Sequence, residues 1–355
     1  MNILANSKVL ERLANREVYD SEINAPPAEK LEHVIQFELT TGCSYGGCGF
    51  CTMYKGQPHN VKTYDEFTQH VDKVWDNFSN PKKGIFRSKK VNDPSKLERI
   101  FIGSGNALRV EPKLLEDAIE YSIKTFKKNT GKLPGRIAMY GNTRDILAKG
   151  KFNLSSNTRD LRFLNCGGTC SGGCSMNKFG EKIGLGLIYW GIESGSSEVL
   201  KFADKGYSRD EVIEAGSILD SSGVKVSAMI ITGLGGKRLA EDHTEKTIRV
   251  LNSIDPRFIT FIGINADETT RYGMKMADEE KNGLNRALTN SELLNQMADI
   301  IQGLRSSTTI GCHGTNVHRF GFNPIDFGSV DINKHYSSDE RDNLVKKIRE
   351  KAKNL

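Results

Sequence analysis

The sequence predicts an α/β protein with a partial or full (β/α) barrel, and a doubly wound open sheet is the alternative. Two patterns favour this class. Short apolar runs that end in Gly, Asn or Cys recur along the chain, as is typical of strands buried on both faces. Helical stretches separate these runs, and strands that alternate with helices pair in parallel through right-handed crossovers. The 355 residues suffice for one such barrel with appendages.

The apolar runs mark six strands and a weaker seventh. They cover residues 33–40, 99–105, 136–142, 185–193, 224–233, 257–265 and, for the seventh, 308–312.

Helices are expected between these strands. Within 111–126, residues at helical spacing form one apolar face, and Pro112 falls in the first turn, where its missing N–H costs nothing. A second helix should end at Gly223 and a third just before Pro256. The face of the first helix consists of Leu115, Ala118, Ile119, Ser122, Ile123 and Phe126.

The chain is expected to divide into three parts. Residues 1–32 form an irregular lead-in, and residues 33–312 form the barrel. The barrel carries an insertion rich in Cys and Gly at about 150–176. Residues 313–355 form a C-terminal extension that ends in a charged helix packed on the barrel.

Composition narrows the partners and the compartment. The net charge is only +6, and charges of both signs alternate, so we expect a solvated surface and no DNA partner. The one dense basic run is Lys82, Lys83, Lys89 and Lys90. Neither a signal peptide nor an apolar run long enough for a bilayer is present, which predicts a cytoplasmic protein without membrane association. Thiols stay reduced there, so the seven cysteines suggest metal binding or catalysis rather than disulfides.

Three of these cysteines directly follow the first predicted strand, in "TTGCSYGGCGFCTMYKG" at residues 40–56. Cys43, Cys48 and Cys51 therefore fall at the carboxyl end of a strand, where α/β folds bind ligands. The interleaved glycines let backbone N–H groups approach the sulfurs of a compact cluster. The spacing alone leaves three interpretations open: an iron-sulfur cluster with one iron free of protein ligands, a zinc site, or structural thiols.

Several segments in the same order resemble the radical S-adenosylmethionine (radical SAM) superfamily. The cysteine segment differs from the usual signature in having four residues between its first two cysteines instead of three. "FIGSGNAL" (101–108) and "YWGIESGSSEVLKFADKGYS" (189–208) follow it, and "SAMIITGLGG" and "LNSIDPRFITFIGI" match further on. The similarity covers about residues 33–265 and is greatest to the branch with oxygen-independent coproporphyrinogen oxidase and the radical domain of elongator acetyltransferase.

The resemblance implies the chemistry of an oxygen-sensitive enzyme. Cys43, Cys48 and Cys51 would hold a 4Fe-4S cluster, and reductive cleavage of S-adenosylmethionine would yield a 5'-deoxyadenosyl radical for hydrogen abstraction. An electron donor such as flavodoxin or ferredoxin would be required. The substrate stays open among small molecules, peptides and RNA.

The resemblance also implies a set of site residues. Glu193 and Tyr140 would be catalytic, although Tyr140 is equally compatible with a core tyrosine whose hydroxyl is hydrogen-bonded. Ser194 also suits a helix cap, and glycines after strands also form ordinary turns. The residues expected to bind the cofactor are Phe50, Gly103, Ser104, Gly105, Asn142, Glu193, Ser194, Gly233, Leu234 and Gly235.

A second group of cysteines departs from the family pattern. Cys166, Cys170 and Cys174 recur every fourth residue in the glycine-rich insertion, and Cys312 at the end of the last predicted strand is a candidate fourth ligand. They suggest an auxiliary iron-sulfur cluster, with a glycine-rich surface loop as the alternative. A different class also stays open, namely a non-catalytic iron-sulfur or zinc protein for binding or delivery.

Overall fold

The computed structural model describes residues 18–21, 24–31, 33–79, 93–155, 185–264, 267–305, 309–312, 322–323, 335–336 and 340–355. The dense basic run and Cys166, Cys170 and Cys174 lie outside these ranges.

Seven parallel strands form the body of the sheet, each paired with the one before it in the chain. They are β1 (Val34–Thr41), β3 (Arg99–Ser104), β4 (Arg136–Gly141), β5 (Leu185–Glu193), β6 (Lys225–Thr232), β7 (Phe258–Ile264) and β8 (Thr309–Cys312). All seven predicted strands are thus confirmed.

The order of the strands decides between the two predicted architectures. It never reverses, as the order in a doubly wound sheet must, so the chain forms a partial (β/α) barrel. The sheet does not close, because the short antiparallel strands β2 (Asn60–Val61) and β10 (His335–Tyr336) pair with β1 and β8. A third short strand, β9 (Phe322–Asn323), pairs with β7.

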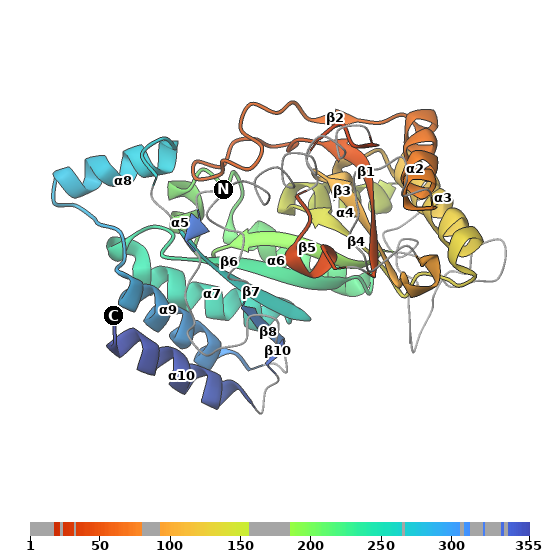
Figure 1. Cartoon of the computed structure of the whole chain (residues 1–355). Coiled ribbons are helices and arrows are strands. Elements are labelled where there is room, and N and C mark those ends of the chain that lie inside the picture. Colours follow the sequence, from red (N-terminus) through yellow and green to blue (C-terminus); the bar gives the residue numbers. More distant parts are fainter. Residues whose placement is uncertain are drawn as a thin grey trace, which may run out of the picture.

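Helices cover the convex face of the sheet. Figure 1 shows α7, α9 and α10 in succession along one side of the strands. The helices are α2 (Tyr64–Ser79), α3 (Pro112–Thr130), α4 (Thr143–Ser155), α5 (Ser197–Phe202), α6 (Arg209–Ser221), α7 (Ala240–Ile254), α8 (Arg271–Lys281), α9 (Asn290–Gly303) and α10 (Arg341–Lys353). Short 3₁₀ turns span Pro27–Glu29, Pro94–Lys96, Ala107–Arg109 and Lys237–Leu239.

The main core lies between these helices and the sheet. All six residues of the predicted apolar face of α3 are buried, and Pro112 begins that helix. The C-terminal helix α10 packs on α9, where Ser291 Oγ donates to Ala352 O at 2.7 Å and Arg349 pairs with Asp299. The apolar residues of this charged helix need a partner, and Leu344, Val345, Ile348 and Ala352 are buried.

The end of the lead-in, residues 24–29, lies against the concave face of the sheet, which the sequence did not reveal. Ala25 packs there with Phe101, Ala138, Leu187 and Tyr189. The fully buried Glu29 accepts a hydrogen bond of 2.7 Å from the Tyr189 hydroxyl and pairs with Arg136. Residues 24–29 therefore cover part of the concave face before the chain enters β1.

No helix in the described ranges is both long enough and apolar enough to cross a membrane.

Candidate functional site

The cysteine loop leaves the carboxyl end of β1 through backbone that favours glycine. Gly42 and Gly46 have φ values of 64° and 61°, in the left-handed region. A Cβ at Gly105, just after β3, would overlap the carbonyl oxygen of Gly42. Glycine is therefore required where the ends of β1 and β3 meet.

The three thiols of this loop are partly buried and free. Cys48 and Cys51 pack against an apolar cluster that includes Phe50, Leu234 and Tyr272. Burial raises the pKa of the Cys51 thiol to about 11, and the charge of Cys48 adds to this effect. Burial also raises the pKa of the Cys48 thiol, and the positive charge of Lys205 opposes this rise. The structure thus brings together four of the residues predicted from sequence, namely Cys48, Phe50, Cys51 and Leu234.

Backbone hydrogen bonds fasten the middle of the loop to two distant segments. Gly49 N donates to Ala203 O at 2.9 Å, after α5, and Tyr272 N in α8 donates to Gly49 O at 3.1 Å. A Cβ at Gly49 would stand 3.0 Å from Asp204 Oδ2, which is tight, and at an ordinary 3.5 Å from Tyr272 N. The two backbone hydrogen bonds therefore hold the loop to both segments.

Side chains reinforce this attachment. The Tyr45 hydroxyl donates to Asp204 O at 2.7 Å, and the guanidinium of Arg144 lies 4.3 Å from the centre of the Tyr45 ring. Arg144 also donates to Gly206 O at 2.7 and 3.0 Å. The turn formed by residues 203–206 is therefore fixed to the cysteine loop on both sides of Lys205.

Glu193 ends β5 beside this turn. Its φ of 66° is unusual for a residue with a side chain and accompanies an irregular register between β5 and β6. The carboxylate Oε1 lies 3.2 Å from Lys205 Nζ, and both residues are buried. Burial raises the pKa of Glu193, and the Lys205 charge opposes that rise.

The segment Gly103 to Gly105 adjoins the cysteine loop at the end of β3. The Tyr54 hydroxyl, from the same loop, donates to Ser104 O at 2.6 Å. Gly105 N donates to Thr40 O at 3.1 Å. This segment lies where the sequence comparison expects the amino end of the cofactor, and its binding role stays a prediction.

The segment Gly233 to Gly235 meets the site through Tyr272. Gly233 N donates to Gln296 Oε1 at 2.7 Å, and Gly235 N donates to the Tyr272 hydroxyl at 2.9 Å. The backbone N–H of Tyr272 also donates to Gly49 O. Tyr272 therefore joins the loop after β6 to the cysteine loop. The role of these three residues toward a cofactor also stays a prediction.

Three other predicted residues form hydrogen bonds within the protein. Ser194 Oγ lies 2.7 Å from His243 Nδ1 in α7, and Asn142 Oδ1 accepts from Asp145 N at 3.0 Å in the first turn of α4. The Tyr140 hydroxyl donates to Asn24 O of the lead-in at 2.8 Å. The Tyr140 contact matches the interpretation as a tyrosine whose hydroxyl is hydrogen-bonded, whereas the residue that caps α5 is Ser196 and not Ser194. The roles of all three residues toward a ligand remain predictions.

Lys205, Tyr207 and Tyr272 were not among the predicted site residues. Judged from the sequence alone, Lys205 would be a solvent-exposed helix residue. In the structure it is only 7% exposed. The signal that could have identified it is its place in the "ADKGYS" end of the segment that resembles the radical SAM superfamily. Tyr272 lies beyond that resemblance and had no such signal.

For the second group of cysteines, the structure gives one placement. Cys312 ends β8 and pairs in register with Phe261 of β7, so its backbone lies at the carboxyl end of the parallel strands. The three cysteines predicted to share a cluster with Cys312 are Cys166, Cys170 and Cys174. They fall in residues that the structure does not describe.

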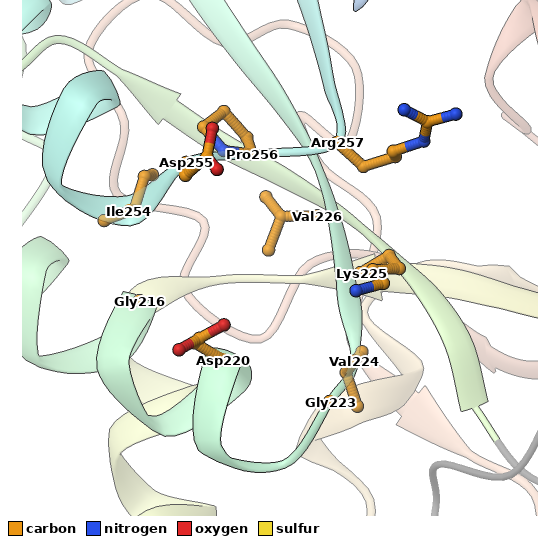
Figure 2. A pocket seen from close by; sticks show the side chains of 10 residues that line it. All are labelled: Gly216, Asp220, Gly223, Val224, Lys225, Val226, Ile254, Asp255, Pro256 and Arg257. Carbon is orange, nitrogen blue, oxygen red and sulfur yellow. The ribbon is translucent and has the colours of Figure 1, made fainter. Parts of the chain in front are cut away.

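A small hollow of about 160 Å³ opens at the opposite end of the strands. Lys225 begins β6 there, and Asp255 and Pro256 connect α7 to β7. Figure 2 shows Asp220 and Asp255 on one side of this hollow and Lys225 and Arg257 on the other. Amino ends of barrel strands serve stability rather than catalysis, so this hollow does not belong to the cysteine site.

Comparison with known proteins finds solved structures to which this chain is similar. No family model and no curated protein match the chain. It is similar to methylornithine synthase PylB, with 14% identity, coverage of 85% of this chain and 70% of that chain, and a TM-score of 0.44. An archaeal Elp3 from Methanocaldococcus infernus with an N-terminal deletion shows 14% identity, 91% and 63% coverage, and a TM-score of 0.46.

A third similar structure is TsrM from Kitasatospora setae, a radical S-adenosylmethionine methyltransferase solved with tryptophan substrate and a SAM analog. Its identity is 12%, its TM-score is 0.44, and the match covers 74% of this chain and 43% of that chain. This chain thus spans less than two thirds of both Elp3 and TsrM.

Proposed function

We propose that the protein is a radical SAM enzyme that uses a 4Fe-4S cluster on Cys43, Cys48 and Cys51 to cleave S-adenosylmethionine reductively and abstract hydrogen from a substrate. The observation that carries the proposal is the placement of three free thiols on one glycine-rich loop at the carboxyl end of β1. Partial parallel barrels bind ligands at this end of the strands. The motif order of the sequence supports the same assignment.

The residues present fit an iron-sulfur cluster. In the described part of the chain, no three His, Cys, Asp or Glu side chains are grouped so that they could hold a metal ion. A cluster of several irons is larger than one ion, and its thiolate ligands stand further apart. Three thiols without a fourth ligand on the loop suit a cluster with one iron open to a cofactor better than a structural zinc, which needs four.

When bound, the reduced cluster and S-adenosylmethionine supply a 5'-deoxyadenosyl radical for hydrogen abstraction. The protein's own residues hold and shield this site. Phe50 and Leu234 bring an apolar wall against Cys48 and Cys51, which limits the access of water to the sulfurs. The backbones of Gly103 to Gly105 and Gly233 to Gly235 offer polar groups beside the loop.

Glu193 is the charged residue that we assign to cofactor binding and catalysis at the end of β5. Its carboxylate is held by Lys205, which fixes its orientation. Tyr140 is assigned to the substrate side of the concave face, and Asn142 and Ser194 to the cofactor's polar groups. Each of these three would have to exchange or share the hydrogen bond that it makes within the protein.

The proposal extends to partners and place. A one-electron donor such as flavodoxin or ferredoxin would reduce the cluster in the cytoplasm, where thiols stay reduced. The substrate would be a small molecule, a peptide or an RNA. An auxiliary iron-sulfur cluster on Cys166, Cys170 and Cys174, with Cys312, would favour reactions that bind substrate to iron or insert sulfur.

The test measures iron, acid-labile sulfide and 5'-deoxyadenosine after anaerobic reconstitution and reduction with S-adenosylmethionine. The intact protein should hold about four irons for one cluster and about eight for two, and should form 5'-deoxyadenosine. Cys43→Ala, Cys48→Ala and Cys51→Ala should each abolish product formation and the catalytic cluster. Thr52→Ala, in the same loop, is the matched control and should retain both.

The outcomes also separate the alternatives. The triple Ala variant at 166, 170 and 174 should lose about four irons only if a second cluster exists. Iron and sulfide without 5'-deoxyadenosine would indicate a non-catalytic iron-sulfur protein. Stoichiometric zinc that excludes iron would indicate a zinc protein, and 5'-deoxyadenosine from a Cys43→Ala variant would overturn the cluster assignment.

A further inference from the structure

Lys205 is a buried cation directly beside the cysteine loop. Its side chain is 8% exposed, and its Nζ lies 5.6 Å from the centre of the Phe50 ring, between Cys48 and Cys51 in sequence. Removing an ammonium group from water costs several kcal/mol unless acceptors replace the water. A surface lysine would avoid this cost, so the surroundings of Lys205 need an explanation.

The ammonium is paired with a buried carboxylate and lies beside aromatic rings. Glu193 Oε1 lies 3.2 Å from Lys205 Nζ, and the centre of the Tyr207 ring lies 5.4 Å from the same nitrogen. The Tyr207 hydroxyl donates to Gly191 O at 2.6 Å, which holds this ring beside Lys205. A carboxylate and aromatic rings favour the charged form of a buried lysine.

The backbone around Lys205 is held against the cysteine loop. Ala203 O, Asp204 O and Gly206 O each accept a hydrogen bond, from Gly49, Tyr45 and Arg144 respectively. Lys205 N donates to Leu200 O at 2.9 Å and closes the turn. The distance between the ammonium and the loop is thus set by fixed backbone rather than by a flexible side chain alone.

We propose that Lys205 is a positioning residue whose ammonium lies beside the cysteine loop, and that the Lys205–Glu193 pair sets the reduction potential of the cluster. This inference rests on the proposed function. One-electron reduction adds a negative charge to the cluster, so the Lys205 ammonium favours the reduced state and the Glu193 carboxylate disfavours it. Hydrogen bonds to sulfur and local net charge are the means by which proteins adjust such potentials.

The two charges give predictions of opposite sign. Lys205→Met should lower the cluster's reduction potential, with at least about a tenfold shift toward the oxidised state, equal to 59 mV for one electron. Glu193→Gln should raise the potential. The double variant leaves no unpaired buried charge, and its reduction potential should lie between those of the two single variants. Lys201→Met, an exposed lysine of α5, is the control and should match the intact protein.

The experiment is a redox titration of the reconstituted protein with dithionite, followed by electron paramagnetic resonance without S-adenosylmethionine. Iron and sulfide are measured first, so that only fully loaded samples are compared. If Lys205→Met fails to fold, Glu193→Gln and the double variant still test the opposite signs. Fully loaded variants whose potentials equal that of the intact protein would overturn the inference.

The same experiment separates this inference from the function on which it rests. An intact protein that takes up no cluster would overturn both. An intact protein that holds a cluster and forms 5'-deoxyadenosine, but whose potential is insensitive to Lys205 and Glu193, would overturn the inference alone.

Discussion

Gly105 and Gly42 touch where β3 and β1 end, so closely that a Cβ at 105 would overlap the Gly42 carbonyl. Since the obstacle is backbone, it cannot rotate away, and Gly105→Ala must push the two strand ends apart. We expect a loss of about 1–3 kcal/mol in unfolding free energy, as for other overpacked sites, and poorer iron uptake because Cys43 follows Gly42 directly. Urea denaturation and iron analysis measure the two effects.

The control for this change is Gly135→Ala. There a Cβ would meet Glu98 O at an ordinary 3.5 Å, and φ is not in the left-handed region. This variant should keep its stability within about 0.5 kcal/mol and its iron. Equal stability and iron content in the two variants would contradict the close contact at Gly105.

Tyr45→Phe tests the attachment of the cysteine loop to residues 203–206. The change removes the hydrogen bond to Asp204 O but keeps the ring beneath Arg144. We expect a loss of about 1 kcal/mol in unfolding free energy and faster hydrogen exchange at the Gly49 amide, which donates to Ala203 O. Tyr64→Phe, at an exposed tyrosine, is the control. An unchanged exchange rate at Gly49 would show that the two contacts are independent.

Two buried histidines predict the response of the fold to acid. Burial, with Lys62, lowers the pKa of His70 to about 4, and burial lowers the pKa of His243 to about 4. His70 Nε2 accepts from Glu38 N at 2.8 Å, so the neutral ring is the one that fits. Unfolded histidine takes up its proton near pH 6.5. The stability is therefore complete above pH 6.5 and is lost as the pH falls toward 4.

His70→Gln is the variant that isolates one of these histidines. At pH 5 each histidine should cost the intact protein about 2 kcal/mol relative to pH 7. The variant should lose about that much less between pH 7 and pH 5 in urea denaturation. The same pH dependence in both proteins would show that His70 is not buried in its neutral form.

Glu193→Ala tests the assignment of this carboxylate to the cofactor. The variant should keep its iron, because the cysteines are intact, and should bind S-adenosylmethionine about tenfold or more weakly, since a charged hydrogen bond contributes about 1.5–3 kcal/mol. Calorimetry on the reconstituted, oxidised protein measures this affinity. Glu198→Ala, exposed on α5, is the control. Loss of iron from Glu193→Ala would assign Glu193 to the structure of the loop instead.

The fold was predictable because its signals are local. Each of the seven parallel strands lies on an apolar run of the sequence, and the face of α3 follows a simple helical period. Whether the barrel closes was not predictable, because the edge strands β2 and β10 are two residues each and their pairing depends on segments far away in the sequence. The position of residues 24–29 depends on Glu29 meeting Tyr189 and Arg136, which no local pattern reveals.

The candidate site divides in the same way. Cys43, Cys48 and Cys51 were assigned to a cluster because their segment resembles the radical SAM superfamily, since their spacing alone left zinc and structural thiols open. Phe50 and Leu234 were assigned from segments in the same order, and these roles stay predictions. Lys205 and Tyr272 could not be ranked, because their importance comes from burial and from contacts with Gly49 and Glu193 that only the folded chain creates. Ser194 and Asn142 were predicted to bind the cofactor from their positions after strands. In the structure Ser194 contacts His243 of α7, and Asn142 accepts a hydrogen bond from Asp145 N in the first turn of α4.

The contacts of the cysteine loop also fix an order of events during protein synthesis. Gly47 and Arg271, which hydrogen-bond across the site, are 224 positions apart. At about 5–20 residues per second, the ribosome makes the cysteines roughly 10–45 s before it makes Arg271. Throughout that interval the thiols lack the wall that later covers them. In the proposed enzyme, cluster insertion would therefore follow translation of α8, and the nascent cysteines would need protection from oxygen until then.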